Sequence, residues 1–253
     1  MPTEIRTCLI PLLSKPEDYS GSVAVILDIL RASSTITYAL NSGAKAIIPC
    51  EAVEEAHQIA EEIKQSEGYP ALLGGERQGM LIKGFDLDNS PARYSAEIVA
   101  GKNIVFTTSN GTRALKHALQ ASRILIGSLI NLDAIVKALS ISDGIIYLVC
   151  AGTDGSVTGE DCLCAGAIAA ELQNLTDQEL AMDDSTRIVV DFYHSQVSLE
   201  NGLLAAVRAS LGGRNLIRRG FEEDIRLCSQ RGLISVVPEY QHQSGKITLS
   251  SDV

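Results

Sequence analysis

The sequence has no tryptophan and few aromatic residues, which make up 4% of its 253 positions. Platforms that stack against bases or sugar rings are built from such side chains, so they are scarce here. The formal net charge of −10 argues against a nucleic-acid partner, because a protein that binds a phosphate backbone needs a basic face. The same charge does not exclude a small anionic substrate, since a few arginines in a cleft set the local potential.

Long apolar runs and paired cysteines are missing as well. No stretch reaches the roughly 18–20 apolar residues that a membrane-spanning helix needs, so we expect no membrane partner. The six cysteines are scattered without any C-x-x-C pair, which argues against a structural zinc site. We expect reduced, mostly buried thiols in a cytoplasmic protein without a secretory leader.

The common phosphate-handling motifs are also absent. There is no G-x-x-x-x-G-K-[ST] and no G-x-G-x-x-G. Leu30 stands two positions after Asp28, where aspartyl-phosphatases of the haloacid dehalogenase type have a second aspartate. Ser156 stands six positions after Cys150, where cysteine-based phosphatases need arginine. We therefore expect Cys150 to be a buried or site-lining thiol rather than a nucleophile.

Hydrophobic strands alternate with amphipathic helices along most of the chain. Residues 23–30 are nearly all apolar, as in a strand buried on both faces, and residues 51–65 have apolar positions at helical spacing. This alternation predicts an α/β protein, layered α/β/α, with a largely parallel or mixed sheet. No Pro- or Gly-rich linker interrupts it, so we treat residues 1–253 as one domain. Two closely packed halves, the second starting near residue 100, are the alternative.

The pattern loosens toward the C-terminus. Residues 176–186 predict a polar connection, residues 195–211 a helix and residues 215–231 an exposed helix. Residues 233–238 and 246–250 predict two strands. A homodimer is the default expectation for an enzyme of this size, because twofold pairs are the commonest assemblies.

Three loops share one design, in which a hydrophobic strand leads into small polar residues and then a helix. They span residues 28–35, 107–113 and 150–161. The carboxyl ends of parallel strands lie at one edge of a sheet, where ligands bind. Helix N-termini at that edge offer N–H groups that suit phosphate. The loops therefore predict an anion site, with simple helix capping by Ser and Thr as the open alternative.

Residues of two kinds in and beside these loops suit an anion. Small polar residues can surround a tetrahedral group, and arginines that follow strand ends bind phosphate or sulfonate through two donors. The predicted phosphate-binding residues are Thr108, Ser109, Asn110, Gly111, Thr112, Arg113 and Gly152.

Carboxylates recur beside the arginines, at Asp28, Glu76, Glu160 and Asp161. An acidic group at the end of a buried strand is costly unless it is paired or binds a metal, and oxygen ligands of this kind suit Mg²⁺. We predict that some of these four hold Mg²⁺, with structural pairs to arginine as the alternative. The predicted catalytic residues are Asp28, Arg31, Glu76, Arg77 and Asp161.

Eight stretches between residues 23 and 247 combine residues in unusual ways: LDILRASSTI, GGER, FDLDNSPARY, TTSNGTRAL, CAGTDG, GEDCLCAGAI, RRGFEEDIRLCSQ and VVPEY. In these stretches the chain resembles the 2-phosphosulfolactate phosphatase family of coenzyme M biosynthesis. The resemblance implies a family-specific fold and a Mg²⁺-dependent phosphomonoesterase. Its substrate would be (R)-2-phospho-3-sulfolactate, and its products 3-sulfolactate and phosphate. The three anionic groups of that substrate would be partners for Arg31, Arg77 and Arg113.

In this hypothesis a metal-positioned water attacks phosphorus and one carboxylate acts as general base. Two other functions stay open. One is a phosphatase for another small phosphorylated carboxylic acid, because sulfonate and carboxylate recognition use the same arginines. The other is a non-catalytic anion-binding module that keeps the pocket.

Overall fold

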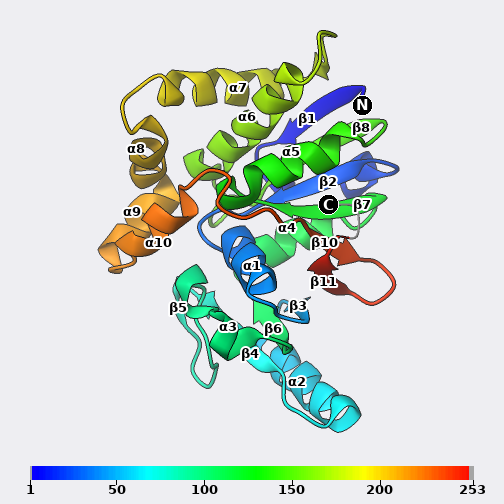
Figure 1. Cartoon of the computed structure of the whole chain (residues 1–253), viewed down its shortest axis with the longest axis vertical. Coiled ribbons are helices and arrows are strands. Elements are labelled where there is room, and N and C mark those ends of the chain that lie inside the picture. Colours follow the sequence, from blue (N-terminus) through cyan, green and yellow to red (C-terminus); the bar gives the residue numbers. More distant parts are fainter. Residues whose placement is uncertain (1, 251–253) are drawn as a thin grey trace.

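The computed structural model describes residues 2–250, in which a mixed 11-stranded sheet lies between layers of helices (Figure 1). The strand order is β5-β4-β6-β3-β11-β10-β7-β2-β8-β1-β9. The strands are β1 (Glu4–Cys8), β2 (Val23–Leu27), β3 (Ala46–Cys50), β4 (Leu72–Arg77), β5 (Met80–Leu81), β6 (Asn103–Thr107), β7 (Arg123–Gly127), β8 (Ile145–Cys150), β9 (Ala181–Met182), β10 (Pro238–Gln241) and β11 (Lys246–Leu249).

The sheet contains two parallel blocks that an antiparallel hairpin joins. Strands β4, β6 and β3 run parallel to one another, as do β7, β2, β8, β1 and β9. The C-terminal hairpin β10–β11 lies between the blocks, with Glu239 opposite Leu125 of β7 and Ile247 opposite Ile47 of β3. The predicted α/β class with a largely parallel or mixed sheet is confirmed.

Helices follow most of the parallel strands. No helix in residues 2–250 is long and apolar enough to cross a membrane. The α-helices are α1 (Ala32–Asn41), α2 (Val53–Glu67), α3 (Ala96–Val99), α4 (Gly111–His117), α5 (Leu132–Ser140), α6 (Gly159–Asn174), α7 (Asp184–Val197), α8 (Gly202–Ala209), α9 (Leu211–Arg218) and α10 (Glu222–Cys228). Short 3-10 segments are Pro11–Leu13, Pro16–Tyr19, Pro91–Arg93 and Leu129–Asn131.

Strand β2 shows why the sheet needs helices on both faces. Its side chains alternate between two apolar clusters: Val23, Val25 and Leu27 pack with α5 and α6, while Ala24 and Ile26 pack with α1 and α4. Successive strand residues point to opposite faces, so an all-apolar strand must be covered twice. A third cluster packs α2 against β3, β4 and β6.

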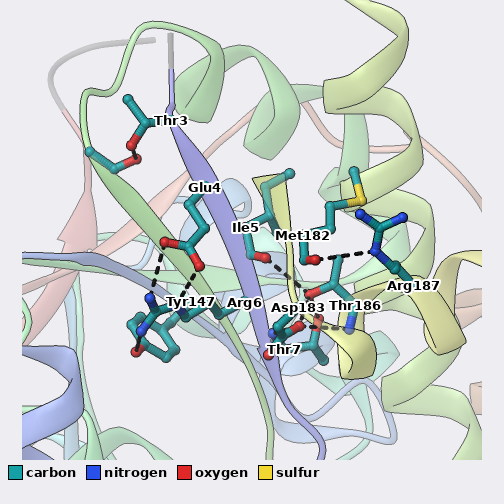
Figure 2. Close-up of polar contacts among 11 residues, drawn as sticks. Thr3, Glu4, Ile5, Arg6, Thr7, Tyr147, Met182, Asp183, Thr186 and Arg187 are labelled. Atoms are coloured by element: carbon teal, nitrogen blue, oxygen red, sulfur yellow. Dashed lines mark hydrogen bonds and ion pairs between the residues drawn. The ribbon is translucent and has the colours of Figure 1, made fainter. Parts of the chain in front are cut away.

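The segment predicted as a polar connection, residues 176–186, instead contains β9 and the start of α7. Asp183 caps α7 by accepting the N–H of Thr186 at 2.8 Å. The same carboxylate accepts the N–H of Thr7 at 3.3 Å, and the Thr186 hydroxyl donates to the carbonyl of Ile5 at 3.2 Å (Figure 2). The prediction was wrong because capping residues have the composition of a loop. Strand β1, which these bonds attach to α7, was not predicted at all.

The exposed helix predicted at residues 215–231 is two helices, α9 and α10, which a break at Gly220 separates. It is not wholly exposed, because Asp224, Ile225 and Cys228 of α10 are buried. The strand predicted at residues 233–238 begins only at the last of these positions. All six cysteines fall within the described residues and are free and buried, as expected.

Gly166 marks the closest approach of α6 to α7, and its substitution tests this packing. A Cβ at Gly166 would lie 2.0 Å from the carbonyl oxygen of Val189 and 2.9 Å from the Cβ of Tyr193. Gly166→Ala should therefore lower the free energy of unfolding by about 1–3 kcal/mol, although alanine is the better helix former. Gly159→Ala in the same helix is the control, because its Cβ would come no closer than 3.7 Å, to Ser210. Urea denaturation measures both, and an unchanged midpoint for Gly166→Ala would contradict this packing.

Candidate active site

A polar cavity of about 90 Å³ lies where β2, β4, β6 and β8 end, the edge of an α/β sheet at which ligands bind. The structure brings together residues of all three predicted loops, the segment around Glu76, and one face of α9. The cavity is lined by Asp28, Leu30, Arg31, Glu76, Gln78, Gly79, Asn89, Ser109, Asn110, Thr153, Asp154, Gly212, Asn215, Leu216 and Arg219.

Asp28 follows β2 and lies between the N-termini of α1 and α4. The backbone N–H groups of Ala32 and Gly111 donate to its carboxylate. Residue 111 has to be glycine for this approach, because a Cβ there would lie 2.8 Å from Oδ2 of Asp28. Burial, followed by the negative charge of Glu76, raises the pKa of Asp28 to about 7.

Glu76 is buried at the end of β4 and connects two loops. Its Oε2 accepts the N–H of Gly79 at 2.6 Å, and its Oε1 accepts the N–H of Ser109 at 2.8 Å. Among the ion pairs of residues 2–250, none involves Asp28 or Glu76. These two carboxylates therefore face one cavity, and neither forms an ion pair with a cationic side chain of residues 2–250.

Asp161 lies behind the cavity and connects the loops that follow β2 and β8. Its Oδ1 accepts the N–H of Ile29 at 3.0 Å, while Oδ2 accepts the N–H of Gly152 at 3.0 Å and the hydroxyl of Thr158 at 3.1 Å. Burial and the charge of Glu160 raise the pKa of Asp161 well above its usual value. Neither Asp161 nor Gly152 lines the cavity. Their hydrogen bond instead helps to hold the loop after β8 in place.

Glu160 is buried beside the start of α9. A Cβ on Gly212 would lie only 2.1 Å from its Oε1. Its Oε2 has no hydrogen-bond partner within the described part of the chain. Burial raises the pKa of Glu160, and its charge in turn raises that of Asp28. An unsatisfied buried carboxylate oxygen is costly, so it calls for a water or a cation.

Arg31 is buried and its charge is balanced within the protein. Its Nη1 donates to Oδ2 of Asp224 at 2.5 Å and its Nη2 to the carbonyl of Gly79 at 3.0 Å. Its Cζ lies 4.2 Å from the centre of the Phe221 ring. The other oxygen of Asp224 accepts the hydroxyl of Ser90 at 2.6 Å. Asp224 and Phe221 were not singled out from the sequence, although the stretch RRGFEED was the available signal.

The other two predicted arginines point elsewhere. Arg77 donates to the carbonyl of Glu51, and to the hydroxyl of Thr107 at 2.9 Å. Arg113 is exposed and lines a neighbouring hollow that also contains His117. The structure therefore does not bring Arg77 or Arg113 into the cavity that holds Asp28.

The loop after β6 enters the cavity only in part. Ser109 and Asn110 line it, and Asn110 Oδ1 accepts the N–H of Asp154 at 3.4 Å. Thr108 and Thr112 are buried on the inner side, with their hydroxyl oxygens 3.4 Å apart. Of the predicted phosphate-binding residues, Ser109 and Asn110 therefore line the cavity, and the other five do not.

Cys150 is fully buried and does not line the cavity. Its hydrogen bond with Cys162, together with burial, raises the pKa of Cys150 well above the usual value for a thiol. The thiolate form that a nucleophile needs is therefore disfavoured, in agreement with the expectation of a buried thiol.

The carboxylates of the cavity suit Mg²⁺, which keeps water and substrate oxygens as ligands, better than a metal ion whose ligands are all protein side chains. Residues 2–250 contain no group of three or more His, Cys, Asp and Glu side chains placed to hold a metal ion. Mg²⁺ usually binds through one or two carboxylates and completes its shell with water and phosphate oxygens. Asp28 and Glu76 offer such a pair, whereas Glu160, whose Oε2 has no hydrogen-bond partner within the described residues, does not line the cavity.

The fold and the cavity together define an α/β enzyme whose negatively charged site lies at the ends of parallel strands. The family model described as 2-phosphosulpholactate phosphatase matches residues 8–243, and the chain belongs to this family. The corresponding enzyme class is that of phosphoric monoester hydrolases.

Three relatives carry the name "Probable 2-phosphosulfolactate phosphatase". The protein of Caldanaerobacter subterraneus is 40% identical over 235 residues, which cover 93% of each chain. That of Clostridium perfringens strain SM101 is 39% identical over 226 residues, 89% of each chain. That of Symbiobacterium thermophilum is 36% identical over 224 residues, 88% of this chain and 93% of the relative.

Asp28 should make the stability of the metal-free protein depend on pH. Its pKa of about 7 in the folded chain exceeds the ordinary value of 3.8. Between these values the folded state keeps a proton that the unfolded state has released. The free energy of unfolding should therefore fall as pH rises through this window, by up to about 1.4 kcal/mol per pH unit from this group. Asp28→Asn should lack this part of the slope.

Urea denaturation in EDTA from about pH 4 to about pH 8 measures the effect. Asp177→Asn, at an exposed turn, is the control and should keep the wild-type slope. Parallel curves for the wild type and Asp28→Asn would show that Asp28 titrates normally.

Proposed function

We propose that the protein is a Mg²⁺-dependent phosphomonoesterase that hydrolyses (R)-2-phospho-3-sulfolactate to 3-sulfolactate and phosphate. The observation that carries the proposal is the pair Asp28 and Glu76, which face one cavity without a cationic partner in residues 2–250. Membership of the family and the names of the relatives support a phosphate ester as the substrate.

The charge of the cavity is the physical reason for a cation. A phosphate ester and two carboxylates repel one another, by about 4 kcal/mol for each pair of unit charges 4 Å apart near a protein surface. An anionic substrate therefore needs a positive charge between it and these side chains. When bound, Mg²⁺ polarises a phosphoryl oxygen and offsets the charge that develops during in-line displacement.

The other roles in the proposed reaction are metal binding, orientation of the phosphate and proton transfer, and different residues of the cavity carry each of them. Asp28 and Glu76 hold the metal, and their positions are fixed by backbone N–H groups from three loops. Ser109 and Asn110 are placed to orient the phosphate. Asp154 is the third carboxylate of the cavity; it is exposed, and Asn110 holds its backbone. We assign Asp154 as the general base that accepts a proton from the attacking water.

The six free, buried thiols support a reducing compartment for this reaction, and we place the enzyme in the cytoplasm.

Phosphate release from phosphosulfolactate by the purified protein tests the proposal. EDTA should abolish turnover and Mg²⁺ should restore it. Asp28→Asn and Glu76→Gln should each raise the Mg²⁺ concentration required, because each removes a ligand. Asp154→Asn should lower kcat by roughly 100-fold or more with an unchanged Mg²⁺ requirement. Asp177→Asn removes a charge at an exposed turn and should behave as wild type.

Full activity in EDTA together with full activity of Asp28→Asn would contradict the proposal. Tight binding of phosphosulfolactate without turnover, across a panel of phosphorylated acids, would instead indicate an anion-binding module.

A further inference from the structure

Arg219 is the cationic side chain of the cavity that forms no ion pair with a carboxylate of residues 2–250. Two arginines line the cavity, and the charge of Arg31 is balanced by Asp224. Arg219 is exposed and takes part in none of the ion pairs found in residues 2–250. Its one hydrogen bond in this part of the chain is a long one, 3.4 Å from Nη1 to the carbonyl of Asn215. Its guanidinium is therefore available to a ligand.

The position of Arg219 follows from the way α9 meets the cavity. Gly212, Asn215 and Leu216 of α9 line it together with Arg219, which directly follows the helix, and this spacing puts all four on one side of α9. Arg219 lies against the turn between β4 and β5, where a Cβ on Gly79 would lie 3.2 Å from its Cδ and 3.4 Å from its Nε. Figure 1 shows α9 on the same side of the molecule as β5. The side chain is exposed and thus lies at the open side of the cavity, whereas Asp28 in the same lining is half-buried.

We propose that Arg219 binds the sulfonate of the substrate and selects for it. The inference rests on the proposed function, in which Asp28 and Glu76 place the phosphoryl group. The substrate carboxylate is on the carbon that bears the phosphate, whereas the sulfonate is one carbon further away. The sulfonate can therefore extend further from the phosphoryl group than the carboxylate can, toward the exposed side of the cavity.

The chemistry of the two groups is complementary. A sulfonate is a very weak base that stays ionised at any physiological pH, and guanidinium is always protonated. Two N–H groups of guanidinium match two oxygens of a tetrahedral anion, and the amide of Asn215 in the same lining offers a further donor. Asp224 already balances Arg31, and the other charged residues of the cavity are acidic, so Arg219 is the positive partner that this lining offers to a second anionic group.

Kinetics of Arg219→Gln with two ligands test the inference. One is phosphosulfolactate, and the other is 2-phospholactate, in which hydrogen replaces the sulfonate; it is followed as a substrate or, by Ki, as a competitive inhibitor. For phosphosulfolactate we expect KM to rise roughly 10- to 100-fold, the loss of a charged hydrogen-bonding pair, with little change in kcat. The KM or Ki of 2-phospholactate should change little. Arg218→Gln is the matched control, because Arg218 is an adjacent, exposed arginine that does not line the cavity.

Calorimetry with the reaction product gives a readout apart from turnover. Wild-type protein with Mg²⁺ should bind 3-sulfolactate more tightly than lactate, and Arg219→Gln should lose that difference. An unchanged KM for phosphosulfolactate, or equal losses with both phosphorylated ligands, would overturn the role of Arg219 and leave the proposed function intact. A wild-type protein that does not hydrolyse phosphosulfolactate would overturn the proposed function, and the inference with it.

Discussion

Repulsion among four neighbouring carboxylates is the constraint on which the site depends. Asp28, Glu76, Glu160 and Asp161 come from three separate segments, and burial with mutual repulsion raises the pKa of Asp28 and Asp161. The fold counters this repulsion with backbone N–H groups: helix N-termini at Asp28, two loops at Glu76 and two more at Asp161. Such donors stabilise negative charge and add no cationic side chain. The negative charge of these carboxylates is therefore not fully compensated by the protein, and a divalent cation can balance it.

Two arginines at this cavity serve different purposes because their partners differ. Arg31 lies between Asp224 and Phe221 and holds the carbonyl of Gly79, so it attaches the C-terminal helices to the ends of β2 and β4. Loss of one partner of a buried pair typically costs about 3–5 kcal/mol, because the other charge is left uncompensated. This attachment keeps the lining face of α9 over the cavity, and Arg219 reaches the ligand space from that face.

Most of the central strands, and the edge where they end, could be predicted because apolar runs and polar loops are local features of the sequence, whereas β1 and the short strand β9 could not. The partner of Arg31 could not, since Asp224 lies 193 positions away and no local pattern says which helix packs over that edge. The different positions of Glu76 and Arg77, in contrast, could have been predicted from the sequence. In a strand, successive side chains point to opposite faces, so a cavity that receives Glu76 cannot also receive Arg77 from the same strand. Arg77 accordingly points toward Thr107.

The composition of the loop after β6 correctly predicts donors for an anion, but it does not identify which anion they bind. Its polar residues and the helix start that follows predict N–H groups aimed at an anion, and the structure has them. The anions they meet are the protein's own: the N–H of Ser109 donates to Glu76, and that of Gly111 to Asp28. Donors already engaged by carboxylates cannot by themselves hold a substrate phosphate as well. In the proposed function the backbone of this loop therefore positions Asp28 and Glu76 as metal ligands, and attraction for the phosphate comes through the cation that they would bind.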